Sequence, residues 1–436
     1  MKKKMAVSIA LLIIFLLISS STFTIILTQK PTKKEKVSLN VIGNITWSGS
    51  SSGYGGFGLV YDSEDNKIFV LTGEYNITVI NPSTYKVIDN ISLKGYINNS
   101  FRYQNLDLGH FSYTNMVYDP ANDYIYIAGG TRFVTVLNGY TDEVVDFINA
   151  TPPGLINGKW HDITHWITEA IALDSQNNCL YIGAMYYWRI GFSITWGDPQ
   201  IVIYNISENR IVGNLSAQSI IKWMNASGNN IPQDLSTALS CFSGIVYDPD
   251  NNYIYAWLTQ WGLVIINATT NQITNFIIAN ISRFDPGYGQ MIYVHDNGCL
   301  YIIYGGIAVY NTKTGNLSYI DYPNMVYSAY SGIYDPYIKS IFTTDLGEGI
   351  NQVINITTNS VVGVFAEGAF PYLLFDPING YIYMVSPGSN TILVISLQSH
   401  TIENNNNAWL MYASFAIVLI VIIIAFIIFK KRKDIK

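Results

Sequence analysis

Two histidines four residues apart form the most metal-like pattern in the chain. In the segment His161-Asp162-Ile163-Thr164-His165, both imidazoles would face the same way on a helix, where Asp162 or Glu169 could complete a zinc site. No helix signal accompanies the pair, no Glu separates the histidines as in a zinc protease, and no Cys lies nearby. We therefore favour a loop histidine pair that is hydrogen-bonded to the backbone, and we expect neither a metal nor another cofactor.

The segment Asp248-Pro249-Asp250-Asn251-Asn252 resembles part of a calcium-binding loop, because oxygen-bearing side chains stand at alternate positions. The same position holds an Asp-Pro turn elsewhere in the chain, so we favour a structural turn. The sequence contains no glycine-rich phosphate loop, no nucleophile elbow and no convincing set of Ser, His and Asp. Motifs alone therefore assign no catalytic residue.

This turn belongs to a sequence motif that recurs along the chain. The motif consists of apolar residues, Tyr-Asp-Pro or a variant, a polar turn with Asn, and then Tyr-Ile-Tyr, as in Met116–Asp119 followed by Tyr124–Tyr126. Successive copies are 41 to 74 residues apart, so the bare repeat has about 41 residues and the rest is insertion. The residues at the Asp position of the seven copies are Asp62, Asp119, Asp174, Asp248, Val294, Asp335 and Asp376.

Each copy continues with two further alternating segments. The third segment ends in Asn, as in Ile77–Asn81, and a fourth follows a polar turn, as in Lys86–Ile91. Period-two alternation with many β-branched and aromatic residues favours strands over helices throughout the repeats. Seven repeats of four short strands predict an all-β fold, a seven-bladed β-propeller with four-stranded blades, flanked by N- and C-terminal hydrophobic helices.

The ends of the repeat region indicate how the ring closes. The segment Val41–Ile45 matches the fourth strand Val87–Ile91, but no first strand precedes it. The last copy has three clear strands and then only Thr401-Ile402. We therefore expect the N-terminal segment to supply the outer strand of the last blade, which would pair edges that are otherwise open.

In these features residues 37–403 resemble the YVTN-type seven-bladed β-propeller repeat proteins of archaea and bacteria. The likeness rests on the Asp-Pro turn, the second strand that begins with Tyr, and third strands of the form Val-x-Val-Ile-Asn. The family tetrapeptide itself is absent, and Tyr126–Gly129 and Tyr383–Ser386 stand in its place. The resemblance implies a fold but no single function. The Ile-, Asn- and Tyr-rich, charge-poor composition is similar to that of surface proteins of thermoacidophilic archaea.

Apolar segments at both ends predict a membrane-anchored protein. Residues 1–36 contain a mostly apolar stretch between lysines, which indicates a signal peptide or an N-terminal membrane anchor. Residues 409–429 form a second apolar run, long enough as a helix to span a bilayer, and a basic tail at 430–436 follows it. The positive-inside rule places this tail in the cytoplasm, so residues 37–403 and a spacer at 404–408 are expected outside the cell.

The charge distribution argues against nucleic-acid binding. Between Val37 and Glu403 there are 12 Lys and Arg residues but 28 Asp and Glu residues. A nucleic-acid partner requires a basic surface that neutralises phosphates, and this segment has none. We expect no nucleic acid among the partners.

Sequons for N-glycosylation lie in the same segment and support its exterior location. We expect the exposed ones to carry glycan if the host glycosylates Asn. The sequons begin at Asn44, Asn76, Asn90, Asn98, Asn149, Asn205, Asn214, Asn225, Asn267, Asn280, Asn316 and Asn355.

The cysteines are too few, and odd in number, for a disulfide framework. Cys179 and Cys299 occupy the same place in two different repeats, so they cannot be neighbours, and Cys241 lies near a strand start. We expect three small, buried apolar side chains.

Strand order assigns each loop to one of two faces of the predicted propeller. Turns between strands one and two, and between strands three and four, lie on the bottom face, whereas two-to-three loops and inter-blade links lie on the top face. The long insertions Lys94–Ser112, Ala150–Trp166, Tyr186–Pro199 and Ala217–Phe242 all fall on the top face of blades one to four. The bottom turns are short.

Aromatic and basic residues in these insertions are suited to stack on sugar rings or to anchor a protein partner. The alternative is that the aromatics pack the insertions onto the blades, which is the role we expect for Trp257 and Trp261 in blade four. The residues predicted for a partner face are Arg102, Trp160, Trp166, Tyr186, Tyr187, Trp188, Arg189, Trp196 and Trp223.

Three functions are compatible with this sequence. The favoured hypothesis is a membrane-anchored, glycosylated extracellular propeller that binds a cell-envelope protein or a glycan through its top-face loops. The second is an extracellular lyase or hydrolase, for which the candidate catalytic residues are Glu169 and His165, just before the first strand of blade three. The third is a purely structural component of the envelope.

Overall fold

The computed structural model of the 436-residue chain describes the repeat region in fifteen segments. The two apolar terminal segments, and with them the predicted anchor, spacer and basic tail at 404–436, lie outside the described residues. No helix in the described segments is both long and apolar enough to cross a membrane. The described residues are 34–46, 58–72, 76–93, 115–129, 133–151, 164–190, 193–196, 199–228, 242–259, 261–279, 290–320, 329–345, 350–367, 372–386 and 390–402.

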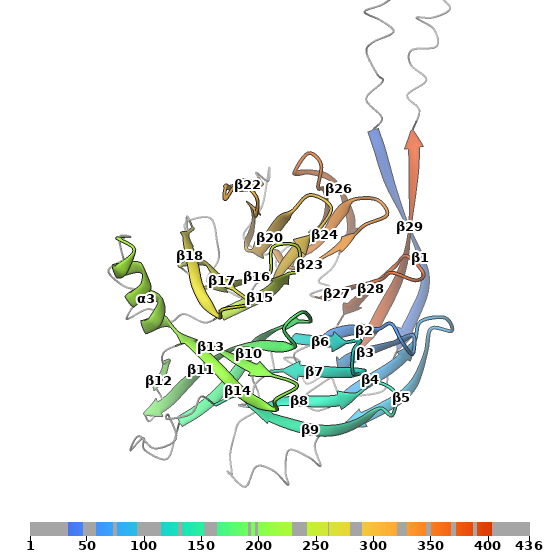
Figure 1. The fold of residues 1–436 in the computed structure, drawn as a ribbon. Helices are drawn as coiled ribbons and strands as arrows, with labels where there is room; N and C mark the ends of the chain where they lie inside the picture. The colour runs from blue at the N-terminus through green and yellow to red at the C-terminus, as the bar shows by residue number, and fades with distance from the viewer. Residues whose placement is uncertain are drawn as a thin grey trace, which may run out of the picture. The chain divides into compact units, whose positions relative to one another are not determined.

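The strands of the first three blades follow the repeat (Figure 1). Blade 1 consists of β2 (Leu59–Asp62), β3 (Lys67–Thr72), β4 (Asn76–Asn81) and β5 (Lys86–Ser92). Blade 2 consists of β6 (Asn115–Asp119), β7 (Tyr124–Ala128), β8 (Phe133–Asn138) and β9 (Glu143–Asn149). Blade 3 consists of β10 (Thr164–Asp174), β11 (Cys179–Ile190), β13 (Gln200–Asn205) and β14 (Arg210–Ser216), with β12 (Ser193–Trp196) paired to β11.

The remaining four blades have the same antiparallel order. Blade 4 consists of β15 (Phe242–Asp248), β16 (Tyr253–Leu258), β17 (Gly262–Asn267) and β18 (Gln272–Ile278). Blade 5 consists of β19 (Gln290–Val294), β20 (Cys299–Tyr304), β21 (Gly306–Asn311) and β22 (Leu317–Ile320). Blade 6 consists of β23 (Ala329–Asp335), β24 (Ser340–Asp345), β25 (Ile350–Asn355) and β26 (Ser360–Glu367). Blade 7 consists of β27 (Tyr372–Asp376), β28 (Tyr381–Ser386), β29 (Thr391–Ile402) and β1 (Lys34–Thr46).

The first strands of the blades meet in a closed cycle. Strand β2 contacts β6, and the series continues through β10, β15, β19 and β23 to β27, which contacts β2 again. The seven sheets therefore form the predicted seven-bladed propeller, which is one compact unit from Leu39 to Leu397. A second unit joins residues 1–38 with residues 398–436, and only the strand ends 34–38 and 398–402 of it are described.

Ring closure occurs as the sequence predicts. Strand β1 lies next to β29 at the outer edge of blade 7, so the N-terminal segment completes the last blade. Ile45 of β1 is buried in one apolar cluster with Val394 of blade 7 and with Val70 of blade 1. Residues from the two ends of the repeat region therefore share a core, and this cluster is here called the closure cluster.

The cores of the propeller lie between neighbouring sheets. Second and third strands are buried on both faces, as in β16 and β17, because each sheet is covered by a blade on either side. Tyr255 and Trp257 of blade 4, for example, pack with Leu300 and Ile302 of blade 5. The outermost strands are largely exposed, and β5 illustrates this with only Ile91 fully buried.

The Asp at the end of the first strand organises the following turn. Asp248 is fully buried, and its Oδ1 accepts hydrogen bonds from the backbone N–H groups of Asp250 at 2.9 Å and Asn251 at 3.3 Å. Its Oδ2 accepts a third bond from Asn251 Nδ2 at 2.8 Å. Asn252 then adopts a positive φ of 56°, which Asn tolerates well. The structural-turn interpretation of this segment is confirmed.

A short helix is the main departure from the expected all-strand pattern. Helix α3 (Ala217–Ala226) begins in the insertion that was predicted as a loop, with the Ser216 side chain accepting a hydrogen bond from Ser219 N at 3.1 Å. Ile220 and Met224, four residues apart, are fully buried against the core between blades 3 and 4. The Ser cap and this apolar spacing were signals in the sequence that the strand-dominated interpretation overlooked.

Candidate functional site

The first two strands of blade 3 are longer than the first two strands of the other blades. These strands, β10 and β11, have 11 and 12 residues, whereas the first strands of the other blades have four to seven. The prediction of a loop at Tyr186–Pro199 is wrong, because β11 continues to Ile190 and β12 pairs back onto it. Thr164–Trp166, predicted as the end of a loop, likewise belongs to β10. Aromatic and β-branched residues are frequent in these stretches, and such residues favour strands.

Strand register brings predicted partner-face residues to neighbouring positions on this extension. Tyr187 of β11 pairs with His165 of β10 on one side and with Trp196 of β12 on the other. The pairs Trp166–Tyr186 and Thr164–Trp188 flank the His165–Tyr187 pair on either side. Three strands therefore carry six of the predicted residues, which are Trp166, Tyr186, Tyr187, Trp188, Arg189 and Trp196. We call β12 and the paired ends of β10 and β11 the blade 3 extension.

The remaining predicted partner-face and metal residues are distributed differently. Trp223 lies on α3, half-buried against the core of blades 3 and 4, so it follows the packing alternative. Trp257 and Trp261 are buried, as expected. Arg102, Trp160, His161 and Asp162 lie outside the described residues, whereas His165 lies on β10 and not in a loop or on a helix. Binding of a metal or of the backbone by the histidine pair stays a prediction.

Glu169, a candidate catalytic residue of the enzyme hypothesis, lies at a β-bulge. The pairing of β10 with β11 shifts between Thr168 and Ala170, so Glu169 is the extra residue. Bulges can re-aim side chains near active sites, but the same shift occurs at Ser243 of β15 and at Tyr330 of β23. All three residues lie five positions before the Asp of their blade. The bulge is therefore a recurrent feature of the blade, and its presence gives no special support to catalysis.

On the bottom face, polar side chains connect neighbouring turns. Asn177 of blade 3 donates through Nδ2 to Asp174 Oδ2 at 2.7 Å and lies 3.4 Å from Asn252 Oδ1 of blade 4. The Tyr247 hydroxyl donates to the same Asn252 oxygen at 3.1 Å. The Asn177 amide therefore donates to one acceptor in blade 3 and one in blade 4. Both oxygens of the buried Asp174 accept hydrogen bonds.

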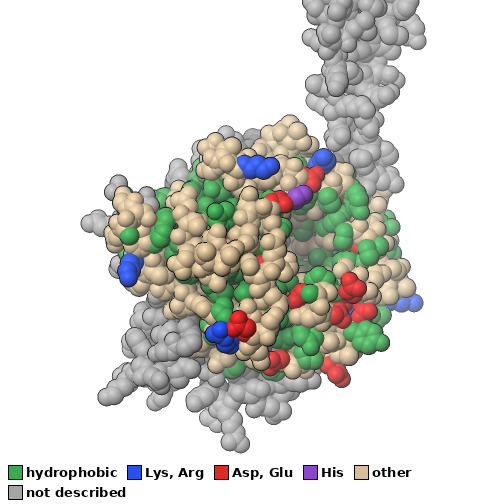
Figure 2. Space-filling model, in the orientation of Figure 1, with side chains coloured by type: hydrophobic (Ala, Val, Ile, Leu, Met, Phe, Trp, Pro, Cys, Tyr) green, Lys and Arg blue, Asp and Glu red, His purple; other side chains and the backbone are tan. Residues whose placement is uncertain are grey.

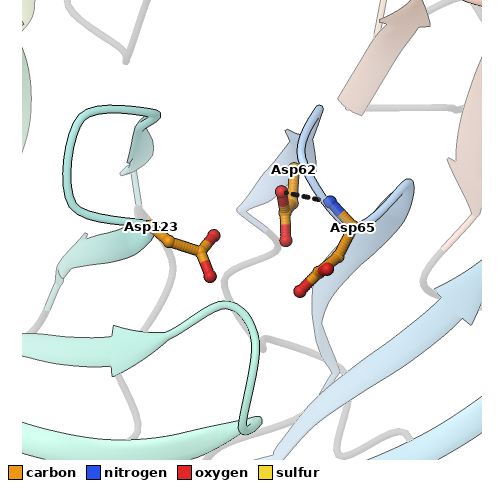
Figure 3. Close-up of side chains that lie close together, drawn as sticks. All are labelled: Asp62, Asp65 and Asp123. Atoms are coloured by element: carbon orange, nitrogen blue, oxygen red, sulfur yellow. Dashed lines mark hydrogen bonds between the residues drawn. The ribbon is translucent and has the colours of Figure 1, made fainter.

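The corresponding place between blades 1 and 2 contains three carboxylates instead (Figure 3). Asp62 ends β2, Asp65 follows in the same turn, and Asp123 belongs to the turn of blade 2. One oxygen of each carboxylate lies within 4.8 Å of the others. Asp62 is fully buried and its Oδ1 accepts from Asp65 N at 3.2 Å, whereas its Oδ2 has no hydrogen-bond partner among the described residues.

Sequence analysis missed this group, here called the acidic cluster, although a signal was present. Aligning the turns shows that Asp65 stands where five other blades have Asn122, Asn177, Asn251, Asn297 and Asn379. Asp123 stands at the position with positive φ, which is Asn or Gly in five of the other blades and Lys339 in blade 6. The proximity of the two acids depends on contacts between blades, which a single repeat does not show.

Burial perturbs the ionisation of Asp123 and of the neighbouring Tyr118. The pKa of Asp123 is raised, mainly by burial and also by the charges of Asp62 and Asp65, and the hydrogen bond from Tyr118 opposes this rise. The Tyr118 hydroxyl donates to Asp123 Oδ1 at 3.0 Å. Burial, together with the neighbouring carboxylates, raises the pKa of Tyr118 as well. Negative charge is therefore concentrated where solvent screening is reduced.

Cysteines and sequons complete the comparison with the sequence. Cys179 and Cys299 are buried free thiols, as expected, and burial is the main cause that raises the pKa of each. Cys241, Asn98 and Asn280 lie outside the described residues.

The sequon asparagines that are exposed are Asn44, Asn76, Asn90, Asn149, Asn214, Asn225 and Asn316. The half-buried ones are Asn205, Asn267 and Asn355, each at the end of a third strand.

The surface chemistry agrees with the acidic composition of the repeat region. On the face drawn in Figure 2, acidic side chains gather on one side of the molecule, and the Lys and Arg side chains are scattered singly. The described residues on this face form no continuous basic patch of the kind that a phosphate backbone requires.

Comparisons with known proteins add no relative to this description. No protein-family model matches the chain, and no curated protein matches it. The assignment as a seven-bladed β-propeller therefore rests on the strand order, the register and the closed cycle of blades.

Proposed function

We propose that the chain is a membrane-anchored, glycosylated extracellular propeller that acts as a binding or adhesion module for a cell-envelope protein or a surface glycan. Residues 1–36 and 409–429 supply the apolar segments for this topology, and the basic tail at 430–436 faces the cytoplasm. On this proposal the protein belongs with the YVTN-type repeat proteins of archaeal cell surfaces.

The observation that carries the proposal is the blade 3 extension. A rigid blade supports three paired strands that continue past it, and His165, Tyr187 and Trp196 occupy one cross-strand row. Tyr and Trp are frequent anchors in protein interfaces, and their rings also stack on sugars. A site on paired strands is held more precisely than one on a loop of the same composition. This arrangement favours binding over a purely structural role.

We expect Tyr187→Ala to weaken partner binding by about 2 kcal/mol, the loss typical of an interface anchor, without lowering the melting temperature. The full-length protein in detergent would be applied to a glycan array and used in pull-downs from envelope extracts, and the affinity for any partner found would then be measured. Tyr140→Ala is the matched control, because Tyr140 is 73% exposed in a bottom-face turn of blade 2. Loss of binding in the Tyr140 variant together with normal binding in the Tyr187 variant would place the partner on the other face.

The proposed topology makes a separate prediction. Protease added to intact cells should remove an epitope inserted at Tyr140 and should spare an epitope fused after Lys436, because the basic tail lies inside. Immunoblots of treated and lysed cells measure both signals. Protection of the Tyr140 epitope in intact cells, or recovery of the full-length chain in the soluble fraction, would contradict the topology.

The enzyme hypothesis is the second candidate and keeps one specific test. Glu169 and His165 both lie on β10, and a screen for lyase and hydrolase activity with the full-length protein would reveal turnover if they act together. We favour binding, because the bulge that holds Glu169 recurs in blades 4 and 6.

A further inference from the structure

The acidic cluster lacks a hydrogen-bond donor that the turns of blades 3, 4 and 7 contain. In blades 3, 4 and 7, an Asn side chain donates to Oδ2 of the buried Asp, and the three distances are 2.7, 2.8 and 2.7 Å. In blade 1 that donor is replaced by Asp65, whose carboxylate can only accept when it is ionised. Asp62 Oδ2 and Asp65 Oδ2 are both buried without a hydrogen-bond partner among the described residues.

The joint between blades 3 and 4 shows what normally occupies this place. There the Asn177 amide donates to Asp174 and approaches Asn252 of the next blade. By alignment, Asp65 replaces Asn177 and Asp123 replaces Asn252. Both replacements remove hydrogens and add negative charge at the same joint, so a bridging group here must be positively charged.

Nearby donors do not neutralise the cluster. Tyr118 contributes one hydroxyl hydrogen, which it donates to Asp123 at 3.0 Å while its oxygen also lies near Asp62. The Tyr140 backbone N–H is a second donor to Asp123. The Lys67 ammonium donates to Gly139 O at 2.8 Å, Tyr140 O at 3.2 Å and Asp142 Oδ1 at 2.9 Å, and lies 3.7 Å from Asp65 Oδ2. Three donors of the ammonium are therefore directed to other acceptors, and only a longer-range attraction reaches the cluster.

Gly139 leaves space beside the carboxylates. A Cβ atom at this position would lie 2.7 Å from Asp123 Oδ1 and 2.9 Å from Asp62 Oδ2, closer than side chains tolerate. The third strands of blades 1 and 3 to 6 are followed at the same place by residues with side chains, namely Pro82, Ile206, Ala268, Thr312 and Ile356. The joint between blades 1 and 2 thus combines the unusual acids Asp65 and Asp123 with a glycine that carries no side chain beside Asp123 Oδ1 and Asp62 Oδ2.

We propose that Asp62, Asp65 and Asp123 bind one Ca²⁺ ion, which joins the turns of blades 1 and 2. The protein ligands are all carboxylate oxygens, which suit a hard divalent cation, and the cluster offers neither the nitrogen nor the sulfur that zinc prefers. Buried Asp62 Oδ2, which is aimed into the cluster without a partner, becomes satisfied by the ion. The ion takes the bridging position that an amide holds between blades 3 and 4.

Asp119 of blade 2 shows that one unpartnered oxygen is not sufficient for this inference. Its Oδ2 also lacks a hydrogen-bond partner, yet no group of three acidic residues forms around it in the described part of the chain. The convergence of three carboxylates from two blades distinguishes the cluster at Asp62.

The test is calcium binding by the full-length protein in detergent, with Asp65→Asn as the decisive variant. This substitution restores the amide found in the other blades, so it should fold normally and should no longer need the ion. Tb³⁺ is the probe, because Tyr118 contacts Asp123 and can sensitise Tb³⁺ luminescence. We expect wild type to show Tyr-sensitised luminescence that Ca²⁺ displaces, with one ion per chain by calorimetry. Asp65→Asn and Gly139→Ala should bind at least about tenfold more weakly.

Thermal melting supplies an independent readout. Ca²⁺ should raise the melting temperature of wild type above its value in EDTA, and NaCl of equal ionic strength should not. Asp65→Asn should melt above wild type in EDTA and should not respond to Ca²⁺. Asp146→Asn, which removes an exposed acid from β9, is the matched control and should behave as wild type. An unchanged calcium response in Asp65→Asn, a full response to NaCl, or no calcium binding by wild type would overturn the proposal.

Discussion

Replacing Ile45 with Asp is expected to unfold the propeller or to lower its melting temperature more than any other change in β1. Ile45 is 3% exposed, and it packs in the closure cluster with side chains of blades 7 and 1. Truncation to Ala alone should cost about 2–5 kcal/mol, and a buried carboxylate without a partner adds a desolvation penalty. Chemical denaturation of the full-length protein would measure the loss.

Val41 provides the matched control on the same strand. It is 63% exposed, so Val41→Asp should change the free energy of unfolding by about 0.5 kcal/mol or less. The contrast between the two Asp variants separates burial in the closure cluster from a general effect of charge on β1. Equal stability of the two variants would show that β1 is not required to close the ring.

The closure of the ring could be predicted because it depends on a local pattern. Val41–Ile45 matches a fourth strand but lacks the rest of a blade, and only the incomplete last copy can use it. The turns were predictable for the same reason, since Asp248 and the residues that it binds are separated by two or three positions. Repeated local chemistry therefore specifies the blade, the number of blades and their joining order.

Features that belong to a single blade were harder to predict. Tyr186–Ile190 lies beyond the length of the repeat, so comparison among copies marked it as loop, whereas pairing with β10 and β12 makes it a strand. Helix α3 occurs once, and its buried face is defined by the neighbouring blades rather than by the repeat. In both segments the tertiary contacts, and not the pattern shared by the repeats, determine the secondary structure.

The acidic cluster illustrates a third limit of sequence reasoning. Asp65 and Asp123 are 58 positions apart, and neither is unusual for an exposed turn. Their significance follows only from the joint between blades, where an Asn pair in blades 3 and 4 reveals the ordinary arrangement. The blade 3 extension has the same limit. Its His, Tyr and Trp residues become neighbours only through the strand register, which the sequence did not reveal.

The second large effect is expected from Asp248→Val, which keeps the volume of a buried side chain but removes its two oxygens. Three donors would lose their acceptor, namely the backbone N–H groups of Asp250 and Asn251 and the Asn251 side chain. The Asn251 side chain is exposed and keeps Thr312 Oγ1 as an acceptor at 3.1 Å, so the loss comes mainly from the two backbone N–H groups. Each buried donor left unsatisfied costs about 1–3 kcal/mol, so the free energy of unfolding should fall by about 2 kcal/mol or more. Denaturation of the full-length protein measures it.

Blade 5 shows why Val is tolerated at one position of the repeat and not here. Val294 is fully buried at the Asp position, but its turn is closed by the backbone of Gly298, which donates to Val294 O at 3.0 Å. The Asn297 side chain of that turn donates to the Tyr301 hydroxyl at 2.9 Å and to Ile356 O at 3.1 Å, so it needs no Asp oxygen. In blade 4 the equivalent Asn251 side chain donates to Asp248.

Asp146→Val is the matched control for Asp248→Val. Asp146 Oδ1 also accepts a hydrogen bond from a backbone N–H, that of Phe147 at 2.7 Å, but this Asp is exposed on β9. Water can replace the lost acceptor there, so the free energy of unfolding should change by about 0.5 kcal/mol or less. If Asp248→Val were as stable as Asp146→Val, the buried Asp would not hold the turn. The repeated Asp would then need an explanation outside the folded blade, because its hydrogen bonds would contribute nothing that water does not supply.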